Sequence, residues 1–490
     1  MSQSLTQTIR GTVVDRVSQT PLPGSSVILL GTDPLVGTTT DPEGNFKLTQ
    51  VPIGSHTIRI TFIGYKDMML PNVIVNSGKE VVLSILLEED ILHLEELVIS
   101  AETNIEKNKP LNEMAVVSAR TFSVEETRKF AAAVNDPARM VSSYAGVVST
   151  SDGNNSISIR GNSPVGLLWR MEGVDIPNPN HFANVATSGG GISILSSQLL
   201  ANSDFLTGAF PAEFGNALAG VFDLNLRKGN NEKREYTVQA GFLGTDIAAE
   251  GPFSKNYRGS YLINYRYSTL SVLSKVGVNI GDAITNFQDL SYNIYLPTKN
   301  LGNFSLFGFG GLSDQTQDAK KDSSQWEEEF SRYNSRYFSN TGAAGIKHAM
   351  TLSTRTYVQS AVVFSGNDNG YEEFRLDDNY EDVFSYRQNH INKKITASAV
   401  LQHKINARHS LRSGVYYNKY FFNLRQRDFN RETNEIEQPL NASGNAQTVQ
   451  AFTQWNYRVT DRLTVNSGIH FLSLFDNQTY SVEPRASVKY

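Results

Sequence analysis

The chain has 490 residues, with 44 Lys and Arg against 49 Asp and Glu and no Cys. The formal charge of −5 is spread without long single-sign blocks, which argues against nucleic-acid binding because that needs a basic surface. Without cysteine, the sequence excludes a disulfide framework, an Fe–S cluster, a thiolate zinc site and a cysteine nucleophile.

The N-terminal residues and the apolar runs predict neither a signal peptide nor a membrane-spanning helix. Residues 1–7 contain no basic region followed by an apolar one. The longest apolar runs, such as residues 81–87, are far shorter than the roughly 18–20 residues that a spanning helix needs. These observations do not exclude a membrane β-barrel, because its alternating strands give no hydropathy peak.

Residues 8–88 are predicted to form a small β-sandwich. Five β-branched runs are separated by turns rich in Pro and Gly, at residues 9–15, 26–30, 44–48, 56–62 and 80–85. Residues 89–114 are predicted to be a linker with one β-prone island, Leu97-Val98-Ile99. Such an island can pair with the sheet edge of a partner protein. The alternative is a last strand of the sandwich.

Residues 115–228 are predicted to form a mixed α+β domain. A helix is expected over 123–143, where Ser123 and Glu126 have the spacing of a capping box. Short strand and turn units with many glycines follow it, including residues 157–161 and 168–175.

Residues 229–490 are predicted to form long antiparallel strands. Val449, Trp455 and Tyr457 alternate with Gln454 and Asn456, which puts apolar side chains on one face and polar ones on the other. Tight connections alternate with long polar stretches at 269–288, 313–336, 366–392 and 426–445, as in outer-membrane barrels. This pattern favours lipid over a soluble core as the surroundings of the apolar face.

The strand count predicts part of a larger barrel. We expect about eleven strands, the first over 235–250, whereas plugged barrels have 22. The chain is therefore expected to be an N-terminal portion that holds about half of a transmembrane β-barrel. The alternative is a complete smaller barrel in which one strand is miscounted.

Taken together, the chain resembles a TonB-dependent outer-membrane receptor of the Bacteroidetes type. Residues 8–88 resemble the carboxypeptidase regulatory-like domain through Gly11-Thr12-Val13 and residues 23–27, 39–46 and 62–65. Plug motifs are Ile159-Arg160-Gly161, residues 171–174, 177–182, 213–217 and 225–229. The motif similar to a TonB box consists of Glu95, Glu96, Leu97, Val98, Ile99, Ser100 and Ala101.

The resemblance implies a transporter in the outer membrane of a Gram-negative bacterium. It would bind an extracellular ligand and import it with energy delivered by TonB. Implied partners are the TonB C-terminal domain, outer-membrane lipid, a surface lipoprotein, and a siderophore, cobalamin, glycan or peptide as ligand. The rival hypothesis is a non-transporting adhesin or assembly scaffold, with a hydrolase third.

The sequence predicts no catalytic or metal site and no cofactor, because catalytic motifs are missing and the eight histidines are scattered. Arg160, with Gly161, is predicted to form a plug-to-barrel latch with a barrel carboxylate; a surface arginine is the alternative. The candidates for facing an extracellular ligand are Asn178, Asn180, His181 and Phe182. For His181 the alternative is a structural role in capping its loop.

Overall fold

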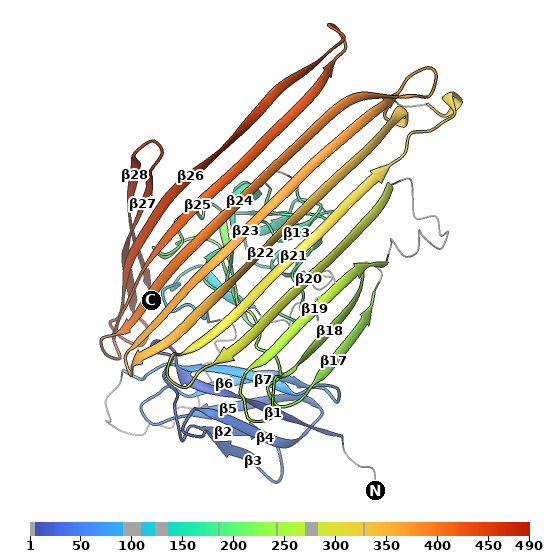
Figure 1. Ribbon diagram of the computed structural model, residues 1–490. Helices are drawn as coiled ribbons and strands as arrows, with labels where there is room; N and C mark the ends of the chain where they lie inside the picture. The colour runs from blue at the N-terminus through green and yellow to red at the C-terminus, as the bar shows by residue number, and fades with distance from the viewer. Residues whose placement is uncertain are drawn as a thin grey trace.

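The computed structural model describes residues 5–91, 109–122, 136–151, 153–184, 187–241, 244–269, 283–326 and 329–490. Three parts follow one another along the chain (Figure 1). A β-domain lies at one end of a large curved sheet, and a smaller mixed unit, the plug, lies against the concave face of that sheet. Among the described residues, no helix is long and apolar enough to cross a bilayer.

The N-terminal β-domain is a sandwich of two sheets, as the sequence predicts. One sheet has the order β4-β1-β7 and the other β3-β2-β5-β6. Their inward residues, such as Val13, Leu29, Phe46 and Ile60, form one buried core. The strands are β1 Thr6–Asp15, β2 Ser26–Leu30, β3 Val36–Thr39, β4 Asn45–Pro52, β5 Gly54–Thr61, β6 Met68–Val75 and β7 Val81–Leu87.

The plug is built on a five-stranded sheet with the order β12-β11-β16-β15-β8, in which β11 and β16 are parallel. Asp136 caps the short helix α2 Pro137–Val141 by accepting from Ala138 N at 2.8 Å. The remaining elements are β8 Ala119–Phe122, β9 Val147–Ser149, β10 Ile157–Ile159, η2 Pro164–Gly166, β11 Leu167–Met171, β12 Val174–Asp175, β13 Asn180–His181, β14 Ile192–Ser193, β15 Ser203–Leu206 and β16 Gly220–Leu224.

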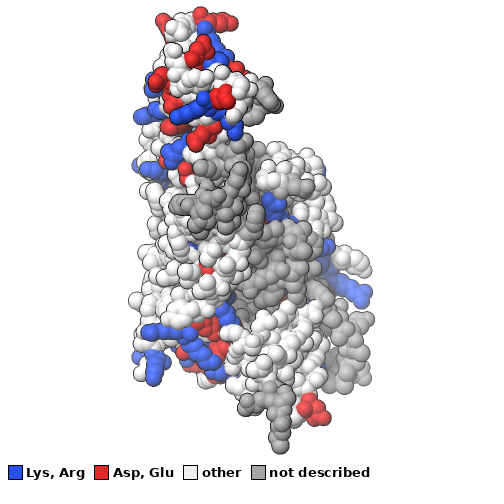
Figure 2. Space-filling view, turned by 90° about the vertical axis from the view of Figure 1, so that its right-hand side faces the viewer, with Lys and Arg blue, Asp and Glu red and all other residues white. Residues whose placement is uncertain are grey.

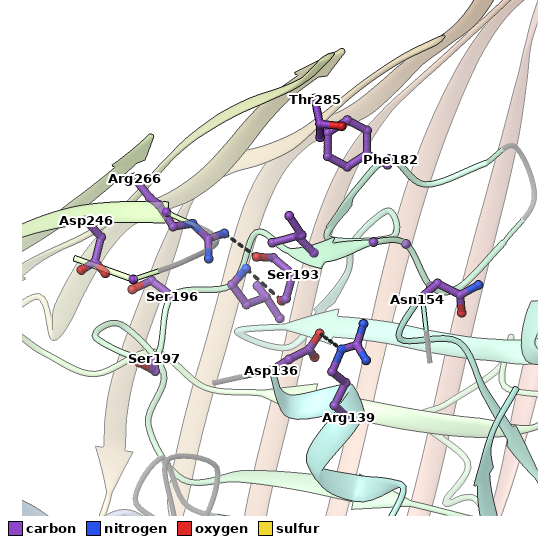
Figure 3. A pocket seen from close by; sticks show the side chains of 18 of the residues that line it. Asp136, Arg139, Asn154, Phe182, Ser193, Ser196, Ser197, Asp246, Arg266 and Thr285 are labelled. Carbon is purple, nitrogen blue, oxygen red and sulfur yellow. Dashed lines mark hydrogen bonds and ion pairs between the residues drawn. The ribbon is translucent and has the colours of Figure 1, made fainter. Parts of the chain in front are cut away.

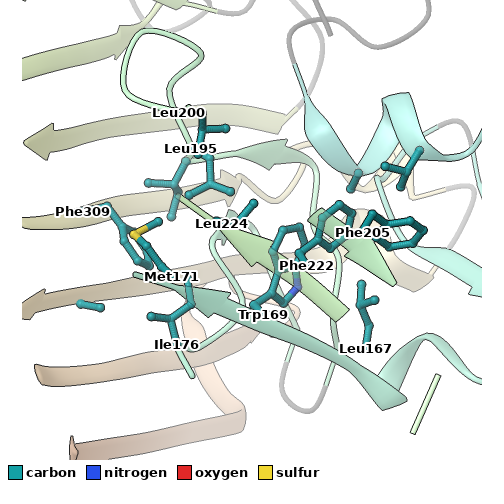
Figure 4. Close-up of a cluster of buried hydrophobic side chains, with 14 of the residues drawn as sticks. Leu167, Trp169, Met171, Ile176, Leu195, Leu200, Phe205, Phe222, Leu224 and Phe309 are labelled. Carbon is teal, nitrogen blue, oxygen red and sulfur yellow. The ribbon is translucent and has the colours of Figure 1, made fainter. Parts of the chain in front are cut away.

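The hydrophobic core of the plug continues onto the wall of the large sheet. Trp169 stacks on Phe222 with ring centroids 4.3 Å apart. Phe309 of the large sheet belongs to the same buried cluster, on the side of Met171 and Leu195 (Figure 4). Apolar packing therefore fixes where the plug sits against the wall.

The large sheet has twelve antiparallel strands in sequence order, from β17 to β28. The expected first strand over 235–250 is two strands, because the chain turns back between Gly241 and Gly244. The twelve are β17 Glu235–Ala240, β18 Gly244–Pro252, β19 Ser260–Ser268, β20 Ala283–Pro297, β21 Asn303–Gln317, β22 Tyr333–Ser353, β23 Thr356–Leu376, β24 Asp382–Lys404, β25 His409–Asn430, β26 Glu435–Arg458, β27 Thr464–Leu474 and β28 Thr479–Lys489. The short elements η3 Ser323–Gln325 and η4 Glu329–Arg332 lie between β21 and β22.

Two of the predicted long loops are mainly strand. Residues 366–392 and 426–445 continue β23 to β26, and only short turns remain, at 377–381 and 431–434. These four strands have 21 to 24 residues, about twice the 9–11 residues that cross a bilayer. The two hairpins are therefore longer than a bilayer crossing requires, and Figure 1 shows them extending past the ends of β17 to β20 and of β27 and β28.

The convex face of the sheet is apolar where the strands would cross lipid. On β23, Val362 is 59% exposed and its neighbour Val363, which faces the plug, is 1% exposed. On the side of the molecule that Figure 2 shows, charged side chains gather near the projecting hairpin ends and again near the β-domain, and the described surface of the sheet between them is mainly uncharged. The predicted inward facing of Gln454 and Asn456 is confirmed, because both are buried and contact the plug or the segment before it.

Candidate functional site

The hairpin turn between β11 and β12 brings the plug against the sheet. Glu172 and Gly173 have positive φ angles, 51° and 83°, as a two-residue type I′ turn requires. Glu172 Oε2 lies 2.5 Å from Lys347 Nζ on β22. The Glu172 carbonyl accepts a hydrogen bond from Gln359 Nε2 on β23 at 3.0 Å. The turn therefore docks on two neighbouring strands.

A buried ionic cluster joins the centre of the plug to β25. Arg170 of β11 and Glu213 are 1% and 3% exposed. Glu213 Oε2 lies 3.2 Å from Arg170 Nη1 and 3.0 Å from Arg412 Nη2 of β25. Arg170 Nη2 also donates to the Tyr416 hydroxyl at 2.5 Å. We call Arg170, Glu213, Arg412 and Tyr416 the central lock.

The carboxylate of Glu213 is held in its charged form. Burial acts to raise its pKa, but Arg412, Arg170 and the hydrogen bonds from Asn112 and Gln454 together lower it by more, so the net direction is downward. These two amide donors complete the shell around Oε1: Asn112 Nδ2 at 2.7 Å and Gln454 Nε2 at 3.2 Å. Because a buried charge without partners is costly, this carboxylate holds Arg170 within the plug and fixes the plug relative to Arg412 of β25.

Residues 109–114, which we call the strap, run from the N-terminal side of the plug to the central lock. The backbone N–H groups of Leu111 and Asn112 donate to the Asp204 carboxylate at 2.9 and 2.8 Å. Gln402 of β24 donates to Glu113 at 3.0 Å. The strap directly follows residues 92–108. That segment contains the predicted TonB-box motif, Glu95 to Ala101, and lies outside the described residues.

The predicted latch at Arg160 is wrong. Arg160 and Gly161 form a tight turn with φ angles of 51° and 80°. Arg160 is exposed, and its guanidinium donates to Ser118 Oγ within the plug at 3.2 Å. A residue at the tip of such a turn projects away from the plug core and does not reach the barrel wall. The buried plug arginine that meets the wall is Arg170.

Three of the four predicted ligand-facing residues instead connect the plug loop to its surroundings. Asn180 and His181 are 0% exposed, and His181 Nε2 lies 3.0 Å from Asp289 Oδ2 on β20. The Asn178 amide donates to the carbonyls of Thr187 and Gly189, both at 2.9 Å. The prediction that Asn180 and His181 face a ligand is therefore wrong, because neither has exposed surface, and they hold the loop in place. Asn178 is half-buried, and its role in ligand binding stays a prediction.

Phe182 lines a cavity of about 890 Å³ between the plug loops and strands β17 to β21. The sheet residues that line it lie at the ends of their strands remote from the β-domain. Most of the polar groups are neutral: Asn154, Ser156, Ser196, Ser197, Gln198, Gln239, Asn264, Thr285 and Gln315. We call this the outer cavity.

Charged groups reach the outer cavity both from the sheet and from the plug. Figure 3 shows Asp246 and Arg266 on the sheet side, and Asp136 and Arg139 on the plug side. Arg266 is anchored by Asp289 at 2.7 Å and donates to the Ser193 carbonyl. Most of the lining residues are polar, so their amide, hydroxyl and charged groups can bind the polar atoms of a ligand, and Phe182 offers one apolar face.

The central lock was missed from the sequence, although a signal for it exists. Arg170 interrupts an otherwise apolar strand, Leu167–Met171, and Glu213 lies between Ala212 and Phe214. A lone charge in such a run must find a partner when it is buried. Arg412 of the sheet carries no comparable signal, because inward polar residues recur along every strand.

A family model described as the CarboxypepD_reg-like domain matches residues 9–99. The chain is 24% identical over 238 residues to TonB-dependent transporter Oar of Myxococcus xanthus, a match that covers 46% of this chain and 21% of Oar. The resemblance to a TonB-dependent receptor with this N-terminal domain is thereby confirmed.

Two solved structures show the same fold. The siderophore receptor PirA from Acinetobacter baumannii is 15% identical, with a TM-score of 0.52, over 76% of this chain and 59% of PirA. The ferric enterobactin receptor PfeA from Pseudomonas aeruginosa is 13% identical, with a TM-score of 0.51, over 76% of this chain and 59% of PfeA. At these identities the likeness shows the fold, a plug within a transmembrane barrel. This chain contains part of that barrel.

Proposed function

The chain has the fold of a TonB-dependent outer-membrane receptor, and from this premise we propose that it is the plug-bearing part of an active transporter. It lies in the outer membrane and binds an extracellular ligand at the outer cavity. TonB pairs with residues 95–101 on the periplasmic side, pulls on them and opens the plug. The proposal requires no cofactor and no covalent chemistry.

The observation that carries this proposal is the ionic attachment of the plug to the wall. The central lock, the Glu172–Lys347 pair and the bond from Lys394 Nζ to the Asp175 carbonyl at 2.7 Å all join charged or polar groups. When these contacts part, water can solvate both sides of each, whereas the apolar contact between the plug and wall residues such as Phe309 keeps its cost of exposure. The work that TonB delivers is proposed to supply that cost.

The ligand is proposed to be a polar compound of the classes that the resemblance implies: a siderophore, cobalamin, glycan or peptide. The outer cavity supports this class, because its amide and hydroxyl groups can bind polar atoms and Phe182 offers one apolar face. PirA and PfeA are named for siderophores, and a siderophore is therefore the first probe to test.

The rival proposal is a surface adhesin or assembly scaffold. The projecting β23–β24 and β25–β26 hairpins favour it, because they place many charged groups outside the membrane, among them Arg375, which pairs with Glu329 of η4 at 3.1 Å. A scaffold would have no use for a plug that TonB can move. Binding of TonB therefore separates the two proposals.

The test measures binding of the purified TonB C-terminal domain to the full-length protein in detergent. Val98→Pro removes a backbone donor from the proposed strand pairing and should abolish binding, whereas Val98→Thr keeps the donor and should bind nearly as well. Uptake of ferric enterobactin, cyanocobalamin, an oligosaccharide or a peptide by cells should follow the same order. Equal binding by both variants would contradict the energy-coupling role.

A further inference from the structure

The β-domain docks on the inner end of the large sheet through ion pairs. Lys404 of β24 contacts Asp15 and lies 2.6 Å from Glu89 Oε2. Lys66 of the β-domain lies 2.7 Å from Asp461 in the turn between β26 and β27. Figure 1 shows the β-domain at this end of the sheet. The interface is ionic rather than apolar, so it can form and separate in water.

Glu88, directly after β7, is the centre of the part of this interface that lies beside the strap. A second group of ion pairs, Lys79–Glu250 at 3.0 Å and Lys233–Glu80 at 2.6 Å, joins the β-domain to β18 and to the segment before β17. The Glu88 carboxylate lies 2.8 Å from Arg458 Nη2 of β26, 3.4 Å from Arg16 Nη1 and 3.5 Å from Lys66 Nζ. It also pairs with Lys109, the first residue of the strap. Its side chain is 19% exposed. One carboxylate thus joins the β-domain, the sheet and the strap.

The β-domain holds the strap at a second point. Arg16 Nη2 donates to the carbonyl of Pro110, next to the Lys109 contact. Two residues further, Asn112 donates to Glu213 of the central lock. A continuous set of contacts therefore runs from the β-domain through the strap to the lock.

The two flanks of residues 92–108 meet at this same place. The segment leaves the β-domain after Ile91, close to Glu88, and rejoins the described chain at Lys109, which pairs with Glu88. Tension applied anywhere within residues 92–108 reaches both flanks, whatever path the segment takes. The Glu88–Lys109 contact joins these two flanks, and the Glu88–Arg458 contact joins them to the sheet.

We propose that the N-terminal β-domain is a clamp on the strap. Glu88 and Arg16 hold Lys109 and Pro110 against the inner rim of the sheet and so keep the strap, and the lock beyond it, in the closed arrangement. Separation of the Glu88 contacts frees the strap to move. The proposal rests on the proposed function only for the source of tension, since the clamp itself is a property of the resting protein.

The test uses the full-length protein in lipid vesicles and needs neither ligand nor TonB. Ala115→Cys, just after the strap and buried, reports strap opening through its rate of labelling by a water-soluble maleimide. The chain has no native cysteine, so the label is specific. A second reporter, Thr20→Cys with Thr354→Cys, measures docking of the β-domain by a short bis-maleimide cross-linker, because Thr20 Oγ1 donates to the Thr354 carbonyl at 3.2 Å.

Glu88→Gln should speed labelling at Ala115→Cys about five- to thirtyfold and reduce the cross-link. Glu43→Gln is the matched control: it removes an equally ionic contact between the β-domain and the sheet, to Arg258 at 3.3 Å, but an exposed one. It should change neither reporter. Lys109→Met, which removes the contact from the strap side, should repeat the labelling result if Glu88→Gln folds poorly.

Two outcomes would overturn the clamp. Loss of the cross-link without faster labelling would mean that the β-domain docks on the rim but does not hold the strap. No change in either reporter would mean that Glu88 holds neither. Failure of TonB binding, by contrast, would overturn the proposed transport function and leave these two readouts unchanged.

Discussion

Asn112 donates a hydrogen bond from its side-chain amide to Glu213 Oε1 at 2.7 Å. This contact joins the strap, which follows the predicted TonB-box segment, to a buried carboxylate that also faces Arg170 and Arg412. Moving the strap therefore removes one hydrogen-bond donor from the buried Glu213 carboxylate, which needs several partners to stay charged. The contact gives a physical route by which displacement of the strap weakens the centre of the plug.

The first prediction compares the two plug arginines. Arg170→Gln leaves buried Glu213 with one cation fewer and should destabilise plug docking by about 3–5 kcal/mol. Arg160→Gln makes the same chemical change at an exposed turn and should stay within about 0.5 kcal/mol. Hydrogen exchange of the β11 and β16 amides measures both. Equal protection from hydrogen exchange in the two variants would mean that the central lock does not hold the plug.

The second prediction concerns the lipid face. Val362 is exposed on the apolar part of β23, so Val362→Arg should reduce the free energy of folding into vesicles by about 2–4 kcal/mol. Trp455 lies near the inner end of β26, where it stacks with Tyr457 and His409. Trp455→Arg should therefore cost about 0–1 kcal/mol. Urea titration in lipid vesicles gives both values, and a larger loss at Trp455 would shift the membrane boundary.

The alternation of apolar and polar side chains along the strands made the sheet predictable. Where that alternation is absent, strands were predicted as loops. Gln454 and Asn456 face inward as expected, since their apolar neighbours define the other face. The projecting parts of β23 to β26 were predicted as loops because both their faces are polar, as at Glu372 and Glu373. In water both faces can be solvated, so the period-two signal disappears although the backbone pairing continues.

The site was harder to predict than the fold, because its residues are brought together by tertiary contacts. Arg160 lies within a recognisable motif, yet its turn leaves it exposed. His181 and Asn180 lie in a polar loop typical of a surface, yet the wall residue Asp289 buries that loop. No local pattern tells that Glu213 and Arg412, nearly two hundred residues apart in sequence, are 3.0 Å apart.

The third prediction is a pH dependence of β-domain docking. Burial acts to raise the pKa of Glu88, but Lys109, Arg458 and Arg16 lower it by more, from 4.5 to about 2. The ionised carboxylate, which also faces Lys66, therefore contributes its full stability above pH 4.5. That contribution falls as the pH decreases from about 4.5 to about 2.

Cross-linking of the Thr20→Cys and Thr354→Cys pair across this pH range measures the effect. Docking should be constant between pH 7 and pH 5 and should weaken below that range. In Glu88→Gln this part of the acid response should be missing, because the glutamine does not titrate. An identical acid response in both proteins would show that other carboxylates, such as Asp15, control docking.

The most direct test of the central claim, that the plug must part from the wall near Glu213 during import, is a reversible tether at that point. A Cβ at Gly468 of β27 would lie 2.9 Å from Ala212 Cβ and 2.8 Å from both Gln454 Cβ and the Thr453 carbonyl oxygen. The strand must therefore shift locally to reach the Cβ separation of about 3.5–4.5 Å that a disulfide needs, and Gly468→Cys alone is the control for that shift. The double variant Ala212→Cys with Gly468→Cys is first oxidised and then reduced. In each state, the measurement is uptake of the labelled probe that the unmodified protein imports. Ala212→Cys alone is a second control. The account predicts that oxidation stops uptake, leaves binding at the cell surface intact, and is reversed by reduction. Uptake at the unmodified rate with the disulfide closed would contradict it.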